Sequence, residues 1–324
     1  MLTHMIALSD QDLSKLLSPP ELVAAIEAAA RLHDEGRTVV PQRLHLEWNG
    51  NTLLTMPAAT AASLGTKLVS VVPGNASRGL PVTNGLMVLN DGETGLPLAI
   101  LNAAALTARR TGAVGALGTK YMTPADLDSV GIIGTGVQGI WQAIFTCAVR
   151  PIRQVFYVCR SPASAKHFRT TLSHHLPGVE LTSCADAREL LARTGLIIAA
   201  TRSAEPVLPD EPALLDGKHF ISIGSFRPTM QELPDSVYRL AGELAIDSEC
   251  ARHEVGDVVG PVERGVLKET DVFFIGQLVT GRHSVDVNCT TAYKSAGMAL
   301  YDLAAAEVAY EAAKRLRIGR EIEI

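Results

Sequence analysis

Apolar and polar positions follow two successive patterns along this chain of 324 residues. In the first pattern, residues at helical spacing are mixed with short alternating runs that are separated by hairpin-type turns. Such a mixture of helices and antiparallel strands predicts an α+β unit over residues 1–118. The expected helices begin at Ser9 and Pro19 and cover 107–121, and the expected strands cover 39–46, 51–56, 65–72, 86–89 and 98–101.

From residue 127 onward, strand-like and helix-like segments alternate, which predicts a parallel sheet with crossover helices. Residues 290–316 then read as one long helix, with Lys294 as a solvated charge near its start. We expect this helix to return to the first domain. The chain is therefore predicted to be α/β, with a Rossmann-type doubly wound domain over 119–301 and a discontinuous α+β domain over 1–118 and 302–324. The expected strands of the doubly wound domain are 129–133, 154–159, 196–200, 219–223 and 243–246, and its helices are 137–148, 162–174 and 185–193.

A glycine-rich turn separates the first expected strand of the second pattern from its helix. It reads Gly134-Thr-Gly136-Val137-Gln138-Gly139. In a strand–turn–helix context, the first glycine permits a tight turn, the second lets a pyrophosphate approach the backbone, and the third allows close packing of helix and strand. The free N–H groups at the start of the helix favour phosphate. The turn is therefore predicted to bind a dinucleotide through Gly134, Gly136, Val137, Gln138 and Gly139.

The end of the next expected strand selects between the two nicotinamide cofactors. The chain reads Cys159-Arg160-Ser161 where an NAD enzyme places an acidic residue for the ribose hydroxyls. An arginine can instead pair with a 2′-phosphate, and the serine can donate a hydrogen bond to it. We therefore expect NADP(H) rather than NAD(H), although a surface arginine after a strand is also common. Further cofactor contacts are expected at Thr201 and Ser225, which could equally cap strand ends, and at Thr111, for which a structural role is the stronger alternative.

Composition restricts the possible partners. The chain is 47% hydrophobic and 19% charged with a net charge of −5, so nothing favours nucleic acid or an anionic membrane surface. Because no apolar run is long enough to span a bilayer and the amino terminus does not resemble a signal peptide, we expect a cytoplasmic protein. The five cysteines are scattered, which indicates neither a disulfide framework nor a zinc site, and no metal is expected.

Three cations of the first domain border apolar segments: Arg43, Lys67 and Arg110. A lysine within an apolar strand is unusual, because burying an ammonium is costly unless it is paired. Two arginines and a lysine suit a small carboxylate substrate, since arginine binds a carboxylate bidentately and lysine can transfer a proton. From composition alone, three separate solvated charges are an equal alternative.

An ordered set of motifs across nearly the whole chain resembles the ornithine cyclodeaminase/mu-crystallin family. The set includes P-Q-R (41–43), G-T-K (65–67), L-T-A-R-R-T-G-A (106–113), G-T-G-V-Q-G (134–139), G-S-F-R-P-T-M-Q-E-L (224–233) and Y-K-S-A-G-M-A-L-Y-D (293–302). The resemblance implies a Rossmann domain for NAD(P), a second domain built from both chain ends that pairs in a homodimer, and a substrate cleft between the domains. It also implies that Arg43, Lys67 and Arg110 bind the substrate carboxylate and transfer the proton.

Two departures from the family pattern narrow the expected substrate. Phe226 and Leu54 stand where cyclodeaminases of this type carry an aspartate and a glutamate. A diamine substrate needs such carboxylates, whereas apolar side chains suit an apolar ring. We therefore expect NADPH-dependent reduction of a cyclic ketimine, 1-pyrroline-2-carboxylate or 1-piperideine-2-carboxylate, to proline or pipecolate. The alternatives are an ornithine or lysine cyclodeaminase, an alanine-type dehydrogenase, and a non-catalytic binding protein similar to mu-crystallin.

Overall fold

The computed structural model describes residues 4–323 and divides the chain into two compact units. The boundaries lie between Arg110 and Thr111 and between Gly297 and Met298, so both ends of the chain belong to the first unit. Helix α3 (Ala103–Met122) contains the first boundary. The sequence-based boundaries, after residues 118 and 301, lie eight and four residues beyond these positions.

The first unit contains a seven-stranded sheet with the order β15-β1-β6-β5-β4-β3-β2. Strands β2 to β6 pair antiparallel as a meander, β1 is parallel to β6, and β15 is antiparallel to β1. The hairpin-type turn expected between residues 46 and 51 is confirmed, because Asn49 and Gly50 both adopt the left-handed conformation that a two-residue turn requires. The strands are β1 (His4–Leu8), β2 (Leu44–Trp48), β3 (Asn51–Ala59), β4 (Ser63–Val71), β5 (Thr83–Asp91), β6 (Pro97–Asn102) and β15 (Arg320–Glu323).

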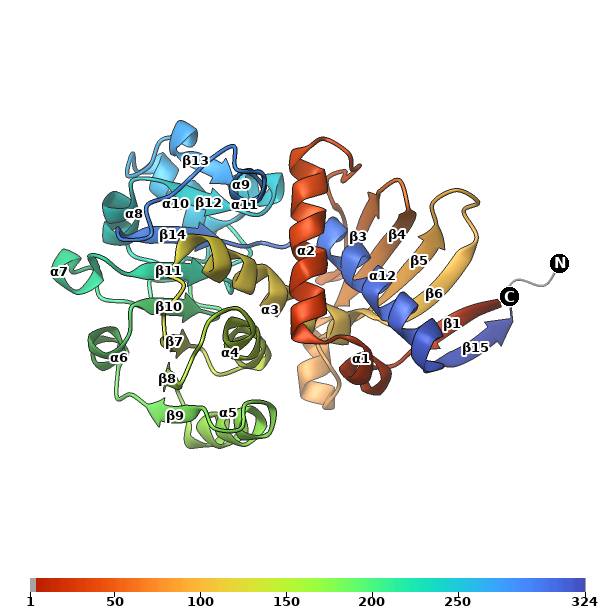
Figure 1. Ribbon diagram of the computed structural model, residues 1–324, viewed down its shortest axis with the longest axis horizontal. Helices are drawn as coiled ribbons and strands as arrows, with labels where there is room; N and C mark the ends of the chain where they lie inside the picture. Colours follow the sequence, from red (N-terminus) through yellow and green to blue (C-terminus); the bar gives the residue numbers. More distant parts are fainter. Residues whose placement is uncertain (1–3, 324) are drawn as a thin grey trace. The chain divides into compact units, whose positions relative to one another are not determined.

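Helix α12 (Ala299–Leu316) covers one face of this sheet. It contacts β3, β4, β5 and β6 and also helix α2 (Pro19–Asp34), and Figure 1 shows it lying across the strands. Most of its buried side chains are small or apolar, including Leu300, Leu303 and a run of alanines, which lets the helix approach the sheet closely. A short helix α1 (Asp10–Leu16) is capped by Ser9 and also contacts α12.

The prediction of one long helix over residues 290–316 is wrong. Residues Thr291–Lys294 form strand β14, which pairs with β11 on one side and β12 on the other, and the helix begins only at Ala299. Lys294 is fully buried at the end of that strand rather than solvated on a helix. Periodicity cannot separate a short apolar strand from a helical segment, and here pairing with two neighbouring strands decides the outcome.

The second unit is doubly wound, as predicted. All neighbouring strands of its eight-stranded sheet are parallel, in the order β13-β12-β14-β11-β10-β7-β8-β9. The order reverses between β7 and β10, which is the switch point where ligands bind in such sheets. The strands are β7 (Ser129–Ile133), β8 (Gln154–Val158), β9 (Glu180–Ser183), β10 (Leu196–Ala199), β11 (His219–Ser222), β12 (Leu244–Ile246) and β13 (Val272–Phe274).

Helices cover both faces of this second sheet. A Cβ at Gly139 of α4 would lie 3.2 Å from Ile132, whereas one at the adjacent strand residue, Gly131, would lie 2.4 Å from Leu190 of α6. Because neighbouring strand residues face opposite sides of a sheet, α4 and α6 pack on opposite faces. The longer helices of this unit, besides α3, are α4 (Val137–Val149), α5 (Pro162–His175), α6 (Ala187–Arg193), α8 (Asp235–Ala241) and α10 (Gly256–Glu263).

Candidate active site

A buried ion pair joins the middle of the first sheet to the helix that covers it. Lys67 on β4 pairs in register with Met56 on β3 and Met87 on β5, and both methionines are buried. Cross-strand partners share a face of the sheet, so the lysine side chain lies on this buried face, toward the helix. There its Nζ lies 2.6 Å from Oδ2 of Asp302, in the first turn of α12.

Helix α3 contributes two more groups to this cluster. The Nε atom of Arg110 donates to Oδ1 of Asp302 at 3.0 Å. Thr107, one turn earlier on α3, accepts from Lys67 Nζ at 3.4 Å and donates to the same Oδ1 at 3.4 Å. Lys67, Arg110 and Asp302 are only 3%, 5% and 0% exposed. Two cations therefore share one carboxylate in a buried environment, and a positive charge is left uncompensated among the three.

The charge state of Lys67 reflects this environment. Burial, together with the charges of Arg110 and Arg43, lowers the pKa of the lysine to about 8, while Asp302 opposes the change. Burial alone would raise the pKa of Asp302, but Arg110 and Lys67 together bring it below its ordinary value. Lys67 can therefore exchange a proton close to neutral pH, whereas Asp302 remains a carboxylate.

Arg43 and Leu54 border the same cluster. Arg43 directly precedes β2, is half-buried, and acts electrostatically on Lys67. Leu54 is half-buried on β3, two residues before Met56, and so points to the same face of the sheet as Lys67. Of the four substrate residues that the sequence assigns to the first unit, Lys67 and Arg110 meet at Asp302, Arg43 acts on Lys67, and Leu54 lies on the same face of the sheet.

The glycine turn of the second unit is built as the motif predicts. Gly134 has a φ of +99°, and a Cβ there would lie 2.5 Å from the carbonyl oxygen of Ala200. A Cβ at Gly139 would lie 2.0 Å from the carbonyl oxygen of Gly134. These two glycines are required by the protein's own packing. By contrast, a Cβ at Gly136 would meet no atom within 4 Å, so this side of the turn is open to a ligand.

The first turn of α4 has free hydrogen-bonding capacity. Gly136 is its N-cap and supplies no side-chain acceptor, and Val137 at the first position is exposed. The buried Oε1 of Gln138 has no hydrogen-bond partner among residues 4–323, and as an acceptor it suits a ligand hydroxyl rather than a phosphate. Helix N–H groups without a cap, beside a glycine with open space, are suited to a phosphate. The residues present therefore fit the pyrophosphate of a dinucleotide.

Residues 159–161 follow β8 directly, so they lie at the carboxyl ends of the strands, as the glycine turn does. Arg160 is exposed, Cys159 is half-buried, and Ser161 caps helix α5 by accepting from the backbone N–H of Ser164 at 3.2 Å. The hydroxyls of Thr135 and Ser164 lie 2.6 Å apart and tie the glycine turn to the start of α5. The site therefore presents a cation and no carboxylate at this strand end.

The remaining predicted cofactor contacts serve buried interactions. Both the backbone N–H and the hydroxyl of Thr201 donate to Oε1 of Glu232, at 2.5 and 2.8 Å. Ser225 is fully buried, and its hydroxyl donates to Asp257. Thr111 is nearly buried, and its carbonyl accepts from Gln142 at 2.9 Å. The contacts of Thr201 and Ser225 hold the loops after β10 and β11, and the second loop carries Phe226, with 44% of its surface exposed.

Sequence reasoning missed several buried charged residues. Asp302 stands in an otherwise apolar helical run, A-L-Y-D-L-A-A-A, and a single acid in such a run is a usable signal for a buried partner. Glu232 lies in an unremarkable polar segment. It and Asp257, for which the sequence suggests only a loop-stabilising role, both accept from the Ser222 hydroxyl at 2.8 Å. Lys294 donates to the same hydroxyl at 3.0 Å. This network binds the carboxyl ends of β11 and β14 together.

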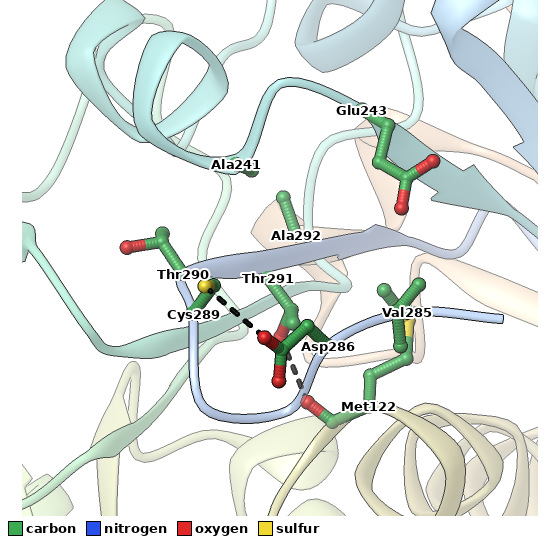
Figure 2. Close-up of a pocket in the computed structure, with 9 residues that line it drawn as sticks. All are labelled: Met122, Ala241, Glu243, Val285, Asp286, Cys289, Thr290, Thr291 and Ala292. Atoms are coloured by element: carbon green, nitrogen blue, oxygen red, sulfur yellow. Dashed lines mark hydrogen bonds between the residues drawn. The ribbon is translucent and has the colours of Figure 1, made fainter.

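A pocket in the second unit lies away from this edge of the sheet. Figure 2 shows Asp286 and Cys289 on the loop before β14, with Glu243 just before β12. These residues surround the amino ends of both strands, whereas nucleotides bind at the carboxyl ends. The pocket is therefore separate from the predicted nucleotide site. Among residues 4–323, no group of three or more His, Cys, Asp or Glu side chains could hold a metal ion, and no described helix is long and apolar enough to cross a membrane.

A doubly wound parallel sheet with a three-glycine turn after its first strand defines the second unit as a Rossmann-type, dinucleotide-binding fold. The chain belongs to the ornithine cyclodeaminase/mu-crystallin family, whose sequence model matches residues 3–316. The resemblance inferred from the motifs is thereby confirmed.

Individual relatives are similar over almost their whole length. The chain is 33% identical to a Delta(1)-pyrroline-2-carboxylate reductase of Bacillus cereus, with 98% of this chain and 100% of the relative aligned. It is also 33% identical to mouse ketimine reductase mu-crystallin, over 92% of each chain.

Solved structures agree with this placement. The Delta(1)-pyrroline-2-carboxylate reductase of Thermococcus litoralis, in complex with NADH and L-proline, is 33% identical with a TM-score of 0.90, covering 98% of this chain and 100% of the other. An archaeal alanine dehydrogenase dimer with bound NAD is 30% identical with a TM-score of 0.90, covering 99% of each chain.

Proposed function

We propose that this protein reduces a small cyclic ketimine carboxylate, 1-pyrroline-2-carboxylate or 1-piperideine-2-carboxylate, to proline or pipecolate with NADPH. The observation that carries this function is the buried cluster of Lys67, Arg110 and Asp302, because it combines a proton donor of suitable pKa with uncompensated positive charge. Similarity to pyrroline-2-carboxylate and ketimine reductases supports the same chemistry.

The cations of the first unit have different roles in the proposed reaction. Arg43 and Arg110 bind the substrate carboxylate, which orients the ring and neutralises the excess positive charge. When bound, the reduced nicotinamide supplies a hydride to C2 of the C=N bond. Lys67 gives its proton to the imine nitrogen, so that the C=N bond becomes a CH–NH bond and the lysine is left neutral. A proton from solvent then restores the ammonium.

Two apolar side chains favour a ketimine over a diamine substrate. Leu54 faces the same side of the sheet as Lys67, and Phe226 is exposed at the loop after β11. Neither can hold or deprotonate an amine, as a cyclodeaminase must do. Both suit the methylene groups of a five- or six-membered ring.

The choice of NADPH rests on the end of β8. Exposed Arg160 offers a bidentate partner for a 2′-phosphate, and residues 159–161 include no acidic side chain to hold the ribose hydroxyls of NAD. Gly134, Gly136, Val137, Gln138 and Gly139 would hold the pyrophosphate. The remainder of the nucleotide site would be lined by Cys159, Ser161, Thr111, Thr201 and Ser225. The hydroxyls of Thr201 and Ser225 are already hydrogen-bonded, so these two residues would act by holding their loops in place.

A homodimer is supported by the exposed side of the first sheet. The face opposite Lys67 carries Leu46 paired with Leu53 and Leu68 paired with Leu86, and all four are exposed. An exposed sheet face that carries several large apolar side chains is typical of a protein–protein interface. A similar solved structure, the archaeal alanine dehydrogenase, is a dimer.

Turnover assays with the purified protein test the function directly. We expect oxidation of NADPH with 1-pyrroline-2-carboxylate or 1-piperideine-2-carboxylate, at a higher kcat/KM than with NADH. Reduction of NAD with alanine would instead indicate a dehydrogenase, and ammonia release from ornithine or lysine a cyclodeaminase. Tight binding of small acids without any turnover would indicate a binding protein and overturn the proposal.

A further inference from the structure

Asp302 is the one acidic side chain that forms an ion pair with Lys67 among the described residues, and both of its oxygens are engaged. Oδ2 accepts from Lys67, and Oδ1 accepts from Arg110 and from Thr107. The carboxylate therefore cannot bind a ligand without first breaking a buried interaction. Because two cations lower its pKa, it is also not a proton donor at neutral pH.

These contacts leave some N–H donors of Lys67 and Arg110 available to a substrate. Lys67 has three N–H bonds, of which one is directed to Asp302 and one, more weakly, to Thr107. Arg110 uses Nε for Asp302, and its terminal NH₂ groups have no hydrogen-bond partner within the described part of the chain. One ammonium hydrogen and the forked end of one guanidinium are what an α-imino carboxylate would need.

Resting on the ketimine reductase function above, we propose that Asp302 is the positioning residue of this site. It fixes Lys67 and Arg110 beside each other, keeps Lys67 in its ammonium form, and leaves the remaining donors of both cations for the substrate. Asp302 itself never touches the substrate or the nucleotide.

The groups around Lys67 show why one carboxylate has this effect. The charged groups acting on the lysine are Arg110 from α3, Arg43 before β2 and Asp302 from α12. Burial and both arginines favour the neutral amine, and only Asp302 favours the ammonium. Without the carboxylate, the pKa of the lysine would therefore fall further, toward the neutral amine that cannot protonate an imine.

The pH dependence of kcat/KM for ketimine reduction separates this role from a merely structural one. In the wild type, we expect kcat/KM to fall as pH rises through about 8, where Lys67 loses its proton. This fall is the alkaline limb of the pH profile. Asp302→Asn, which has nearly the same shape, should move the limb to lower pH by at least about one unit, since an opposite charge at this range shifts a pKa by roughly 1–3 units. The substrate's own titration is common to both enzymes and cancels in the comparison.

Two variants serve as controls. Asp302→Glu retains the charge and should keep the limb near its wild-type position, even if the longer side chain lowers the maximal rate. Glu307→Gln alters another partly buried carboxyl of α12, one that is hydrogen-bonded to Ser63 and not to Lys67. Its limb should not move. Loss of rate in Asp302→Asn with an unmoved limb would overturn the proposal.

An NMR titration tests the same role without catalysis. With [¹³Cε]lysine-labelled protein and Lys67 assigned by Lys67→Arg, Asp302→Asn should lower the titration midpoint of Lys67, and Arg110→Gln should raise it. Midpoints that are equal in all three proteins would overturn the role of Asp302. If Asp302→Asn does not fold, the Asp302→Glu and Arg110→Gln titrations decide, since an unchanged midpoint in Arg110→Gln would show that the cluster does not control the lysine.

Different results would contradict the ketimine reductase function and the positioning role of Asp302. If the wild type reduces no cyclic ketimine, the proposed function is wrong, whatever the lysine titration shows. If the wild type turns over but neither the limb nor the midpoint depends on Asp302, the function stands and the positioning role is wrong.

Discussion

Lys67 and Asp302 are separated by 235 positions in the sequence, yet their charged groups lie 2.6 Å apart in the fold. The lysine belongs to the fourth strand of the first sheet, and the aspartate to the last helix. That helix can complete the cluster only because the chain returns to its first unit after the whole second unit. The discontinuous domain is thus a condition for this charge arrangement.

Replacing Lys67 should separate charge from proton transfer. Lys67→Met removes both, and Lys67→Arg retains a positive charge that does not give up its proton near neutral pH. We expect both variants to lose roughly 10²- to 10⁴-fold in kcat/KM, the usual contribution of a general acid. Affinity for the nucleotide, measured by fluorescence titration, should be unchanged. Substantial ketimine reduction by Lys67→Arg would contradict proton donation by the lysine.

The two directions of the reaction should depend on pH with opposite sign. Reduction needs the Lys67 ammonium, so its kcat/KM should fall as pH rises through about 8. Oxidation of proline or pipecolate needs the neutral amine as a base, so its kcat/KM should rise through the same range. Steady-state assays in both directions, at pH values on either side of this range, test the prediction. Parallel limbs in the two directions would show that another group transfers the proton.

Two glycines of one turn should respond differently to alanine. A Cβ at Gly139 would lie 2.0 Å from a backbone oxygen, so Gly139→Ala should destabilise the fold, by about 1–3 kcal/mol if it behaves as ordinary overpacking. Gly136→Ala meets no neighbouring atom and should keep the wild-type Tm, but it should weaken nucleotide binding at least about tenfold by blocking the pyrophosphate. Calorimetry of both variants, with and without nucleotide, distinguishes them. Unchanged affinity in Gly136→Ala would place the pyrophosphate elsewhere.

Arg160 should decide between the two nucleotides. Arg160→Gln removes the proposed partner of the 2′-phosphate and should raise the KM for NADPH by about tenfold or more, the effect of losing one charge-assisted contact, while leaving the KM for NADH nearly unchanged. Arg153, another exposed arginine just before the amino end of β8, provides the matched control. If Arg153→Gln and Arg160→Gln behave alike, the 2′-phosphate is not bound at this strand end.

The exposed face of the first sheet should control assembly. Leu46 and Leu53 are cross-strand partners on that face. Two buried, unpaired carboxylates at an interface are costly, so the double variant Leu46→Glu with Leu53→Glu should convert a dimer to a monomer in light scattering. Leu96→Glu, at an exposed leucine in the turn between β5 and β6, should remain dimeric. A double variant that stays dimeric would exclude this face as the interface.

Local patterns predicted the doubly wound sheet well, because its strands and helices alternate with clear changes of period. Some strands of both sheets could not be predicted from local patterns. Strands β1 and β15, at the chain ends, depend on pairing with each other and with β6 rather than on an internal pattern. The local pattern of residues 290–316 predicts a helix where β14 forms, because only its two parallel neighbours stabilise the extended form of Thr291–Lys294.

The sequence by itself determined the elements whose physics is local: the glycine turn, the hairpins, the helix starts and the alternation of the second unit. It also identified Arg43, Lys67 and Arg110 as unusual cations beside apolar segments. Only the tertiary structure decided how their charges are compensated. That compensation depends on Asp302, and the effect of a carboxylate on a lysine falls steeply with distance and exposure, neither of which is encoded in a stretch of neighbouring residues.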